Sequence, residues 1–165
     1  MTMREYLCQQ CEEMLALERG YMELSDEMIA DSQNTWVKEM LNNQRVLIWQ
    51  RTDNLQTLVK LLGGKPHEVE DKTAVDPLLA YHRWKEHTPS QEVIDLHNAY
   101  TSASIAQKDI PLYHGIIQLA RKLENEEVAL TVERFITDQE DYLSTLCAGL
   151  PALVDQLMAQ RRKAA

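Results

Sequence analysis

Glycine and proline are scarce in this chain, with five of each among 165 residues, and aromatic residues make up only 6%. Glycine and proline usually form the turns between short strands, so their scarcity favours an all-α fold. Cysteine is also rare: an odd total of three is unlike a disulfide scaffold, and we expect free thiols. Cys8 and Cys11 fall inside a helical segment and are interpreted as small buried hydrophobes. The apolar fraction of 44% is enough for a sizeable core.

Long apolar runs and extended basic clusters are missing as well. No window approaches the ~18 consecutive apolar residues of a membrane span, and the acidic N-terminal segment is unlike a signal or transit peptide. Seventeen basic against 26 acidic residues give a net charge of −9, and the only basic cluster is residues 161–163. We therefore expect residues 1–165 to form one cytoplasmic, soluble domain that binds neither nucleic acid nor a membrane.

Apolar residues recur every three or four positions in four long segments, which is typical of amphipathic helices. A capping box formed by Thr2 and Glu5 precedes the first segment, and Gly63 follows the second. Asn125 begins the fourth, because its side chain can cap the helix and two glutamates follow it. The four segments are Leu7–Met28, Val37–Leu62, Val93–Leu123 and Val128–Leu146.

The connection between the second and third segments is long. It runs from Gly63 to Gln91, contains three prolines, and includes one short helix predicted from Asp76 to His87. A connection of this length can travel the full height of a helical bundle. Two antiparallel hairpins joined by such a crossover predict a ferritin-like four-helix bundle. After Gly149, a separate short C-terminal helix is predicted for Pro151–Lys163.

Polar residues interrupt the apolar faces near the middle of each helix. Glu18 and Gln44 lie about fourteen residues before and after the first hairpin turn, so at ~1.5 Å per residue they share one level. Asp109 and Asp138 are placed likewise about the second turn. The third segment is expected to bury Val93, Leu96, Tyr100, Ala103, Gln107 and Ile110. The predicted polar layer consists of Glu18, Gln44, Arg51, Gln107, Asp109, Asp138 and Gln139.

This layer has three interpretations. A di-iron or di-manganese carboxylate centre takes a Glu from each of two helices and a Glu-x-x-His pair from each of the other two, and the four segments contain no Glu-x-x-His. A site for iron, manganese or a single weak cation would therefore depend on Glu18, Asp109 and Asp138. The structural alternative expects no cofactor. In it Arg51, one turn from the level of Glu18, pairs with that carboxylate.

The first hairpin is similar to that of a known group of proteins. Ala16-Leu17-Glu18-Arg19, Leu41 with Gln44, and Leu61-Leu62-Gly63 keep the spacing of the bacterial stress-induced YciE/YciF-like, ferritin-like family. The second hairpin fits as well, at Tyr113, Leu119-Ala120, Leu123, Ile136 and Leu146.

The resemblance implies a dimetal centre that has decayed. The family's helix 1 glutamate matches Glu18, whereas its other ligand positions match Gln44, Leu47, Ala106, Asp109, Asp138 and Gln139. It also implies dimers and a link to stress responses. We therefore expect a non-catalytic protein that acts through self-association, as a dimer, or through a protein partner. The alternative is a di-iron or di-manganese oxidase, peroxidase, ferroxidase or iron-handling protein. Trp49, between the core stripes of its helix, is a candidate oligomer contact.

Overall fold

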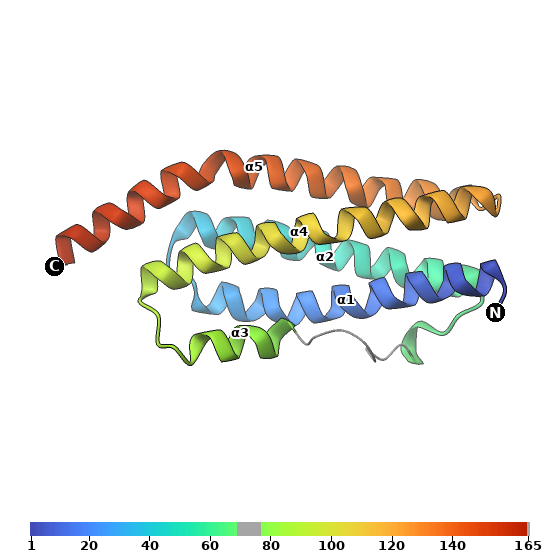
Figure 1. The fold of residues 1–165 in the computed structure, drawn as a ribbon, viewed down its shortest axis with the longest axis horizontal. Coiled ribbons are helices and arrows are strands. Elements are labelled where there is room, and N and C mark those ends of the chain that lie inside the picture. Colours follow the sequence, from blue (N-terminus) through green and yellow to red (C-terminus); the bar gives the residue numbers. More distant parts are fainter. Residues whose placement is uncertain (69–76, 165) are drawn as a thin grey trace.

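The computed structural model describes residues 1–68 and 77–164 of the chain. Its long helices form two hairpins that pack together as a bundle, with α1 against α2 and α4 against α5 (Figure 1). The short helix α3 lies beside α1 as part of the crossover between the hairpins. This confirms the predicted all-α, ferritin-like arrangement. The elements are α1 (Met3–Asp31), α2 (Thr35–Leu62), the 3-10 helix η1 (Pro66–Glu68), α3 (Pro77–Lys85), α4 (Gln91–Lys122) and α5 (Glu126–Ala164).

The helix ends follow the local signals in the sequence. The Thr2 hydroxyl accepts a bond from the backbone N–H of Glu5, and the Glu5 carboxylate accepts one from the N–H of Thr2, which completes the predicted capping box. Gly63 ends α2 with a φ of +94°, a left-handed conformation that suits glycine. The Asn125 side chain caps α5 by accepting a bond from the N–H of Val128. The cap expected at Asp76 lies outside the described residues.

The C-terminal segment is helical, but the prediction of a separate helix was wrong. Helix α5 continues through Gly149 and Pro151 to Ala164, and Figure 1 shows it bending toward its C-terminal end. Proline weakens a helix interior, yet Leu153 and Leu157 are buried in the core beyond it, and this burial favours continuation. Gly149 instead allows a close approach, because a Cβ there would lie 2.2 Å from the Trp36 ring.

The apolar core is divided by polar residues at mid-bundle. One cluster includes Leu15, Leu55 and Tyr113, a second includes Tyr21, Ile48 and Ile105, and a smaller third includes Tyr142 and Leu146. Along α1, α2 and α4 the chain passes between the first and second clusters through one buried polar residue on each helix. These are Glu18, Arg51 and Asp109.

Helix α4 buries a different face from the one predicted. Val93, Tyr100 and Gln107 are exposed, so the expected stripe is rotated away from the core. The N-terminal half of α4 instead buries a largely polar face that includes Asp95, Asn98 and Ser102. Apolar periodicity did not predict the inward face of α4, because the surface that this face packs against is polar.

That surface is the connection between α1 and α2. The Asp95 carboxylate accepts bonds from the backbone N–H groups of Gln33 and Asn34, at 2.8 and 3.2 Å. The Asn98 amide donates to the carbonyl of Met28 at 3.2 Å and to the Ser32 hydroxyl at 2.9 Å. Backbone groups at helix ends need such partners when they are buried. The polar face of α4 therefore attaches the second hairpin to the turn of the first.

Helix α3 is held against the bundle by polar and aromatic contacts. The Tyr81 hydroxyl donates to the Asp31 carboxylate at 3.0 Å, and Lys85 forms ion pairs with Glu27 and Asp31. The ring of Trp84 stacks on His97 of α4, with 3.6 Å between centroids. Within the described ranges, no helix is long and apolar enough to cross a membrane.

Candidate functional site

Glu18 and Arg51 form a bidentate ion pair in the middle of the bundle. Arg51 Nε donates to Glu18 Oε1 at 2.6 Å, and Nη2 donates to Oε2 at 3.1 Å. The two side chains are 0% and 1% exposed. The planar fork of a guanidinium matches the two oxygens of a carboxylate, so both bonds can be made at once. This contact confirms the structural pairing predicted from the sequence.

Tyr113 of α4 is the third member of this group. Its hydroxyl donates to Glu18 Oε1 at 2.6 Å, so that oxygen accepts bonds from two helices. Burial, followed by the negative charge of Glu18, raises the pKa of the Tyr113 hydroxyl, which remains a donor. Burial lowers the pKa of Arg51, but the charges around it, Glu18 first, raise the pKa above its ordinary value. The carboxylate is therefore anchored from α2 and α4 together.

Asp109 lies beside this group and is 1% exposed. Burial and then the charge of Glu18 raise the pKa of its carboxyl from 3.8 to about 7, against the opposing charge of Arg51. One guanidinium cannot neutralise two buried carboxylates, so Asp109 carries a proton through much of the acidic range. Asp109 Oδ2, Arg51 Nη1 and Gln139 Nε2 are buried without hydrogen-bond partners among the described residues.

A second polar group occupies the same bundle nearer to the α1–α2 turn. Gln44 Nε2 donates to the carbonyl of Ser102 at 3.0 Å, and the Ser102 hydroxyl donates to Gln44 Oε1 at 2.5 Å. The hydroxyl of Tyr142 also bonds to the Ser102 hydroxyl. Burial raises the pKa of Tyr142 to about 12. Gln44 is therefore committed to a neutral network that joins α2, α4 and α5.

Several residues of the predicted layer lie elsewhere. Gln107 is exposed, and Asp138 is only partly buried, whereas its neighbour Gln139 is buried. In the part of the chain that the structure describes, no group of three or more His, Cys, Asp or Glu side chains could hold a metal ion. Glu18 and Asp109 are close enough to interact electrostatically, but Asp138 does not complete a site with them.

The side chains at mid-bundle do not fit a dimetal centre. Such a centre needs carboxylate oxygens and histidine nitrogens directed at two cations. Here both oxygens of Glu18 face Arg51, whose positive charge would repel a metal ion at that position. Gln44 is bonded to Ser102, and Leu47 cannot coordinate a metal. The arrangement can bind and release a proton at Asp109.

Sequence reasoning missed two members of these groups. Tyr113 lies on an apolar stripe that predicts a core residue, because periodicity cannot show where a hydroxyl will find an acceptor. Ser102 lies on the face of α4 that the pattern placed outside the core. Its position four residues after Asn98 and seven after Asp95 was the available signal, because this spacing puts three small polar residues on one helical face.

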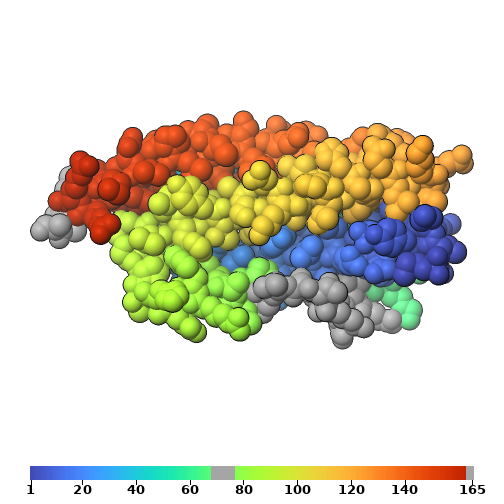
Figure 2. Space-filling model, viewed as in Figure 1, coloured from blue at the N-terminus to red at the C-terminus, as the bar shows by residue number. Residues whose placement is uncertain are grey.

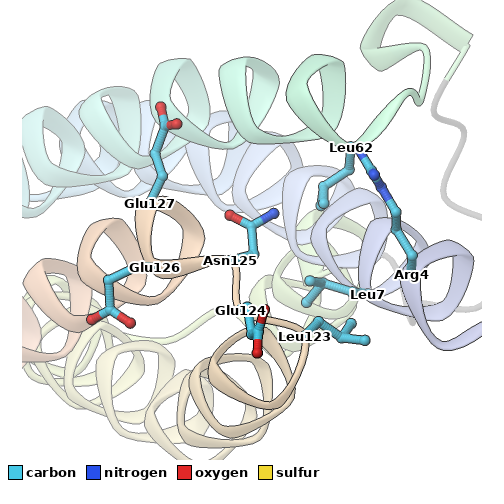
Figure 3. A pocket seen from close by; sticks show the side chains of 8 residues that line it. All are labelled: Arg4, Leu7, Leu62, Leu123, Glu124, Asn125, Glu126 and Glu127. Carbon is cyan, nitrogen blue, oxygen red and sulfur yellow. The ribbon is translucent and has the colours of Figure 1, made fainter.

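A groove also lies at the end of the bundle formed by the start of α1 and the α4–α5 turn. It is lined by Arg4, Leu7, Leu62 and residues 123–127, and Figure 3 shows the side chains of Glu126 and Glu127 pointing in different directions. The acidic groups do not converge on one point. These glutamates instead suit the first turn of α5, where negative charge interacts favourably with the helix dipole.

The first prediction concerns the coupling between Glu18 and Arg51. Arg51→Met or Glu18→Leu alone leaves a buried charge without its partner and should lower the free energy of unfolding by about 3–5 kcal/mol. The double variant should lose at least about 2 kcal/mol less than the sum of the single losses. Urea unfolding of the four proteins measures this. The exposed pair of Arg45 with Asp26 is the control, with an expected coupling below about 1 kcal/mol. Additive losses at Glu18 and Arg51 would contradict the pairing.

The second prediction is a pH dependence caused by Asp109. The pKa of Asp109 is about 7 in the folded protein, whereas its ordinary value is 3.8. The folded state therefore holds this proton more tightly, and the resulting stabilisation is complete below pH 3.8 and is lost as the pH rises through 7. From pH 5 to pH 8, wild-type stability should fall by about 2–3 kcal/mol more than that of Asp109→Asn. Denaturant unfolding at the two pH values tests this. Equal pH dependence in the two proteins would show that Asp109 does not carry the proton.

The chain was matched to a known family and to solved structures of similar fold. The family described as Domain of unknown function (DUF892) matches residues 2–159. A comparison with curated proteins finds no match. A solved structure from Xanthomonas campestris pv. campestris is similar with a TM-score of 0.80, at 17% identity over 98% of this chain and 99% of the other. For YcfI from Rhodopseudomonas palustris the TM-score is 0.73, at 15% identity over 88% and 93%.

A third structure is described as that of ferritin-like, diiron-carboxylate proteins from Bacillus anthracis. It has a TM-score of 0.67, at 18% identity over 91% of this chain and 99% of the other. At such identities these likenesses show the fold alone. The family match covers nearly the whole chain, so the protein belongs to the DUF892 family and has the helical bundle of ferritin-like proteins.

Proposed function

We propose that this ferritin-like protein has lost dimetal chemistry and acts through association, first of all with a second copy of itself. The loss of dimetal chemistry is supported above all by the bidentate pairing of Arg51 with Glu18. The guanidinium supplies at mid-bundle the positive charge that a metal ion would otherwise provide to the glutamate. Removing it would leave a buried carboxylate unpaired, so the pair favours a metal-free protein.

The residues around the pair support the same proposal. The position that the YciE/YciF-like resemblance assigns to a helix 2 ligand is Gln44, which is engaged with Ser102. The corresponding helix 3 position is Ala106, which has no ligand atom. Asp109 is protonated over part of the pH range, and a protonated carboxyl is a poor ligand for a hard cation. We infer a degenerate centre in a member of that stress-induced group, acting in the cytoplasm as a single domain of residues 1–165.

The third prediction concerns metal content. Protein purified without chelator should contain iron and manganese at well below one ion per chain by elemental analysis. The comparison protein is the double variant Glu18→Leu with Arg51→Met, which removes the pair without leaving an isolated charge and should give the same background. Near-stoichiometric iron or manganese in the wild type that is absent from the double variant would overturn the proposal and favour a metalloenzyme or iron-handling protein.

An exposed apolar face on α2 supports self-association. Trp49 is 61% exposed, and Val46, one turn earlier on the same helix, is also exposed. Large aromatic side chains are costly to leave in water and are enriched in protein interfaces. A second copy could bury both side chains by packing α2 against α2. A dimer formed in this way would have a two-fold axis, the commonest symmetry of soluble oligomers.

The fourth prediction concerns this dimer. The wild type should sediment as a dimer at micromolar concentration, and Trp49→Glu should sediment as a monomer because a charge would be buried at the contact. Tyr100→Glu is the matched control, since Tyr100 is 50% exposed on α4, and it should remain a dimer. A monomeric wild type, or a dimer that persists in Trp49→Glu, would contradict the proposed contact.

A further inference from the structure

A surface cavity lies between helices α1, α3 and α4. Its volume is about 370 Å³, within the range of small-molecule sites. Figure 2 shows the face of the molecule on which α3, in green, lies against the first half of α4. The lining residues are Leu17, Tyr21 and Leu24 of α1, Pro77, Ala80, Tyr81 and Trp84 of α3, and His97, Thr101, Ser104, Ile105 and Lys108 of α4. We refer to it as the α3 cavity.

The floor of the α3 cavity is apolar. Leu24 and Ile105 belong to the buried core, and Leu17 packs against it. Aromatic rings gather at one end, where Trp84 stacks on His97 and the centroid of the Tyr81 ring lies 5.8 Å from that of Trp84. This end and floor can bury the apolar part of a ligand but offer little to a polar one.

The side formed by α4 is polar and leads to a positive charge. His97, Thr101, Ser104 and Lys108 follow one another at intervals of four, three and four residues, so they share a helical face. At ~1.5 Å per residue, the distance along α4 from His97 to Lys108 is about 16 Å. The α3 cavity is therefore elongated, with aromatic rings at one end and an ammonium group at the other.

Charge distinguishes this cavity from two other grooves that the described residues form. Among the residues that the structure describes, no carboxylate lines it, although the chain has 26 acidic residues and a net charge of −9. The groove in Figure 3 includes Glu124, Glu126 and Glu127, and a third groove includes Glu92 and Asp95. Lys108 makes no ion pair within 4 Å with any residue that the structure describes. Burial lowers the pKa of His97, which favours its neutral ring, so the ammonium group of Lys108 supplies the positive charge of the described lining.

We propose that the α3 cavity binds a small carboxylic acid with an elongated apolar body. The ligand's carboxylate pairs with the Lys108 ammonium, its body lies on Leu17, Leu24 and Ile105, and its far end meets the Trp84 and His97 rings. The hydroxyls of Thr101 and Ser104 line the path between the two ends. An acid fits better than an amine, because none of the lining side chains within residues 1–68 and 77–164 carries a negative charge.

The fifth prediction tests this with two probes of equal length and opposite charge. Decanoate and decylamine, each below its micelle concentration, are titrated calorimetrically into the full chain. Decanoate should bind saturably with one site per chain and at least about tenfold more tightly than decylamine. This order is opposite to what the net charge of −9 alone would give, since nonspecific attraction favours the amine.

Lysine variants identify the site. Lys108→Gln should weaken decanoate binding about tenfold, because it removes one charge-assisted contact from an exposed side chain that the fold does not need. Lys122→Gln, at the far end of the same helix, should leave the affinity unchanged. The proposal fails if decanoate shows no saturable binding, if decylamine binds equally well, or if Lys108→Gln binds decanoate as the wild type does. It also fails if both lysine variants lose affinity equally.

Discussion

The buried ion pair between Glu18 and Arg51 is the contact on which the arrangement of this bundle depends. Two charges removed from water are stable only when their geometry is good and their remaining hydrogen-bonding capacity is used. Arg51 meets both carboxylate oxygens, and Tyr113 adds a third bond. A shift of α1, α2 or α4 by one turn would break at least one of these bonds. The pair and its bond from Tyr113 therefore fix the positions of three helices along the bundle axis, which apolar packing alone specifies less strictly.

Different kinds of interaction join the two hairpins at different heights along the bundle axis. Around Leu15, Leu55 and Tyr113 the contact is apolar packing. Near the α1–α2 turn, Asp95 and Asn98 satisfy backbone groups of the first hairpin. Polar contacts of this kind are directional, so they add specificity to the non-directional hydrophobic effect. Between these two regions, at mid-bundle, polar atoms of Arg51, Asp109 and Gln139 lack hydrogen-bond partners among the described residues. The Asp109 carboxyl there can bind or release a proton at a pH near 7.

Local chemistry made some features predictable and left others open. The Thr2–Glu5 capping box and the end of α2 at Gly63 depend on a few neighbouring residues, and the structure has both. The pairing of Glu18 with Arg51 was predictable because two opposite charges interrupt apolar stripes at nearby levels. The inward face of α4 was not, since Asp95 is buried by a turn more than sixty residues away. Continuation of α5 through Pro151 likewise depends on distant core contacts.

The sequence by itself determined the helices, the two hairpins and the presence of Glu18 and Arg51 at mid-bundle. Apolar periodicity, helix caps and the residue types at possible metal-ligand positions are all encoded along the chain. Tertiary structure decided which polar residues meet. It brought Tyr113 to Glu18, turned Asp138 partly outward, and placed Lys108 at a cavity whose described lining has no carboxylate. Those outcomes depend on how helices rotate and stack against one another. Rotation is set by the sum of all contacts across the bundle, which no single helix contains.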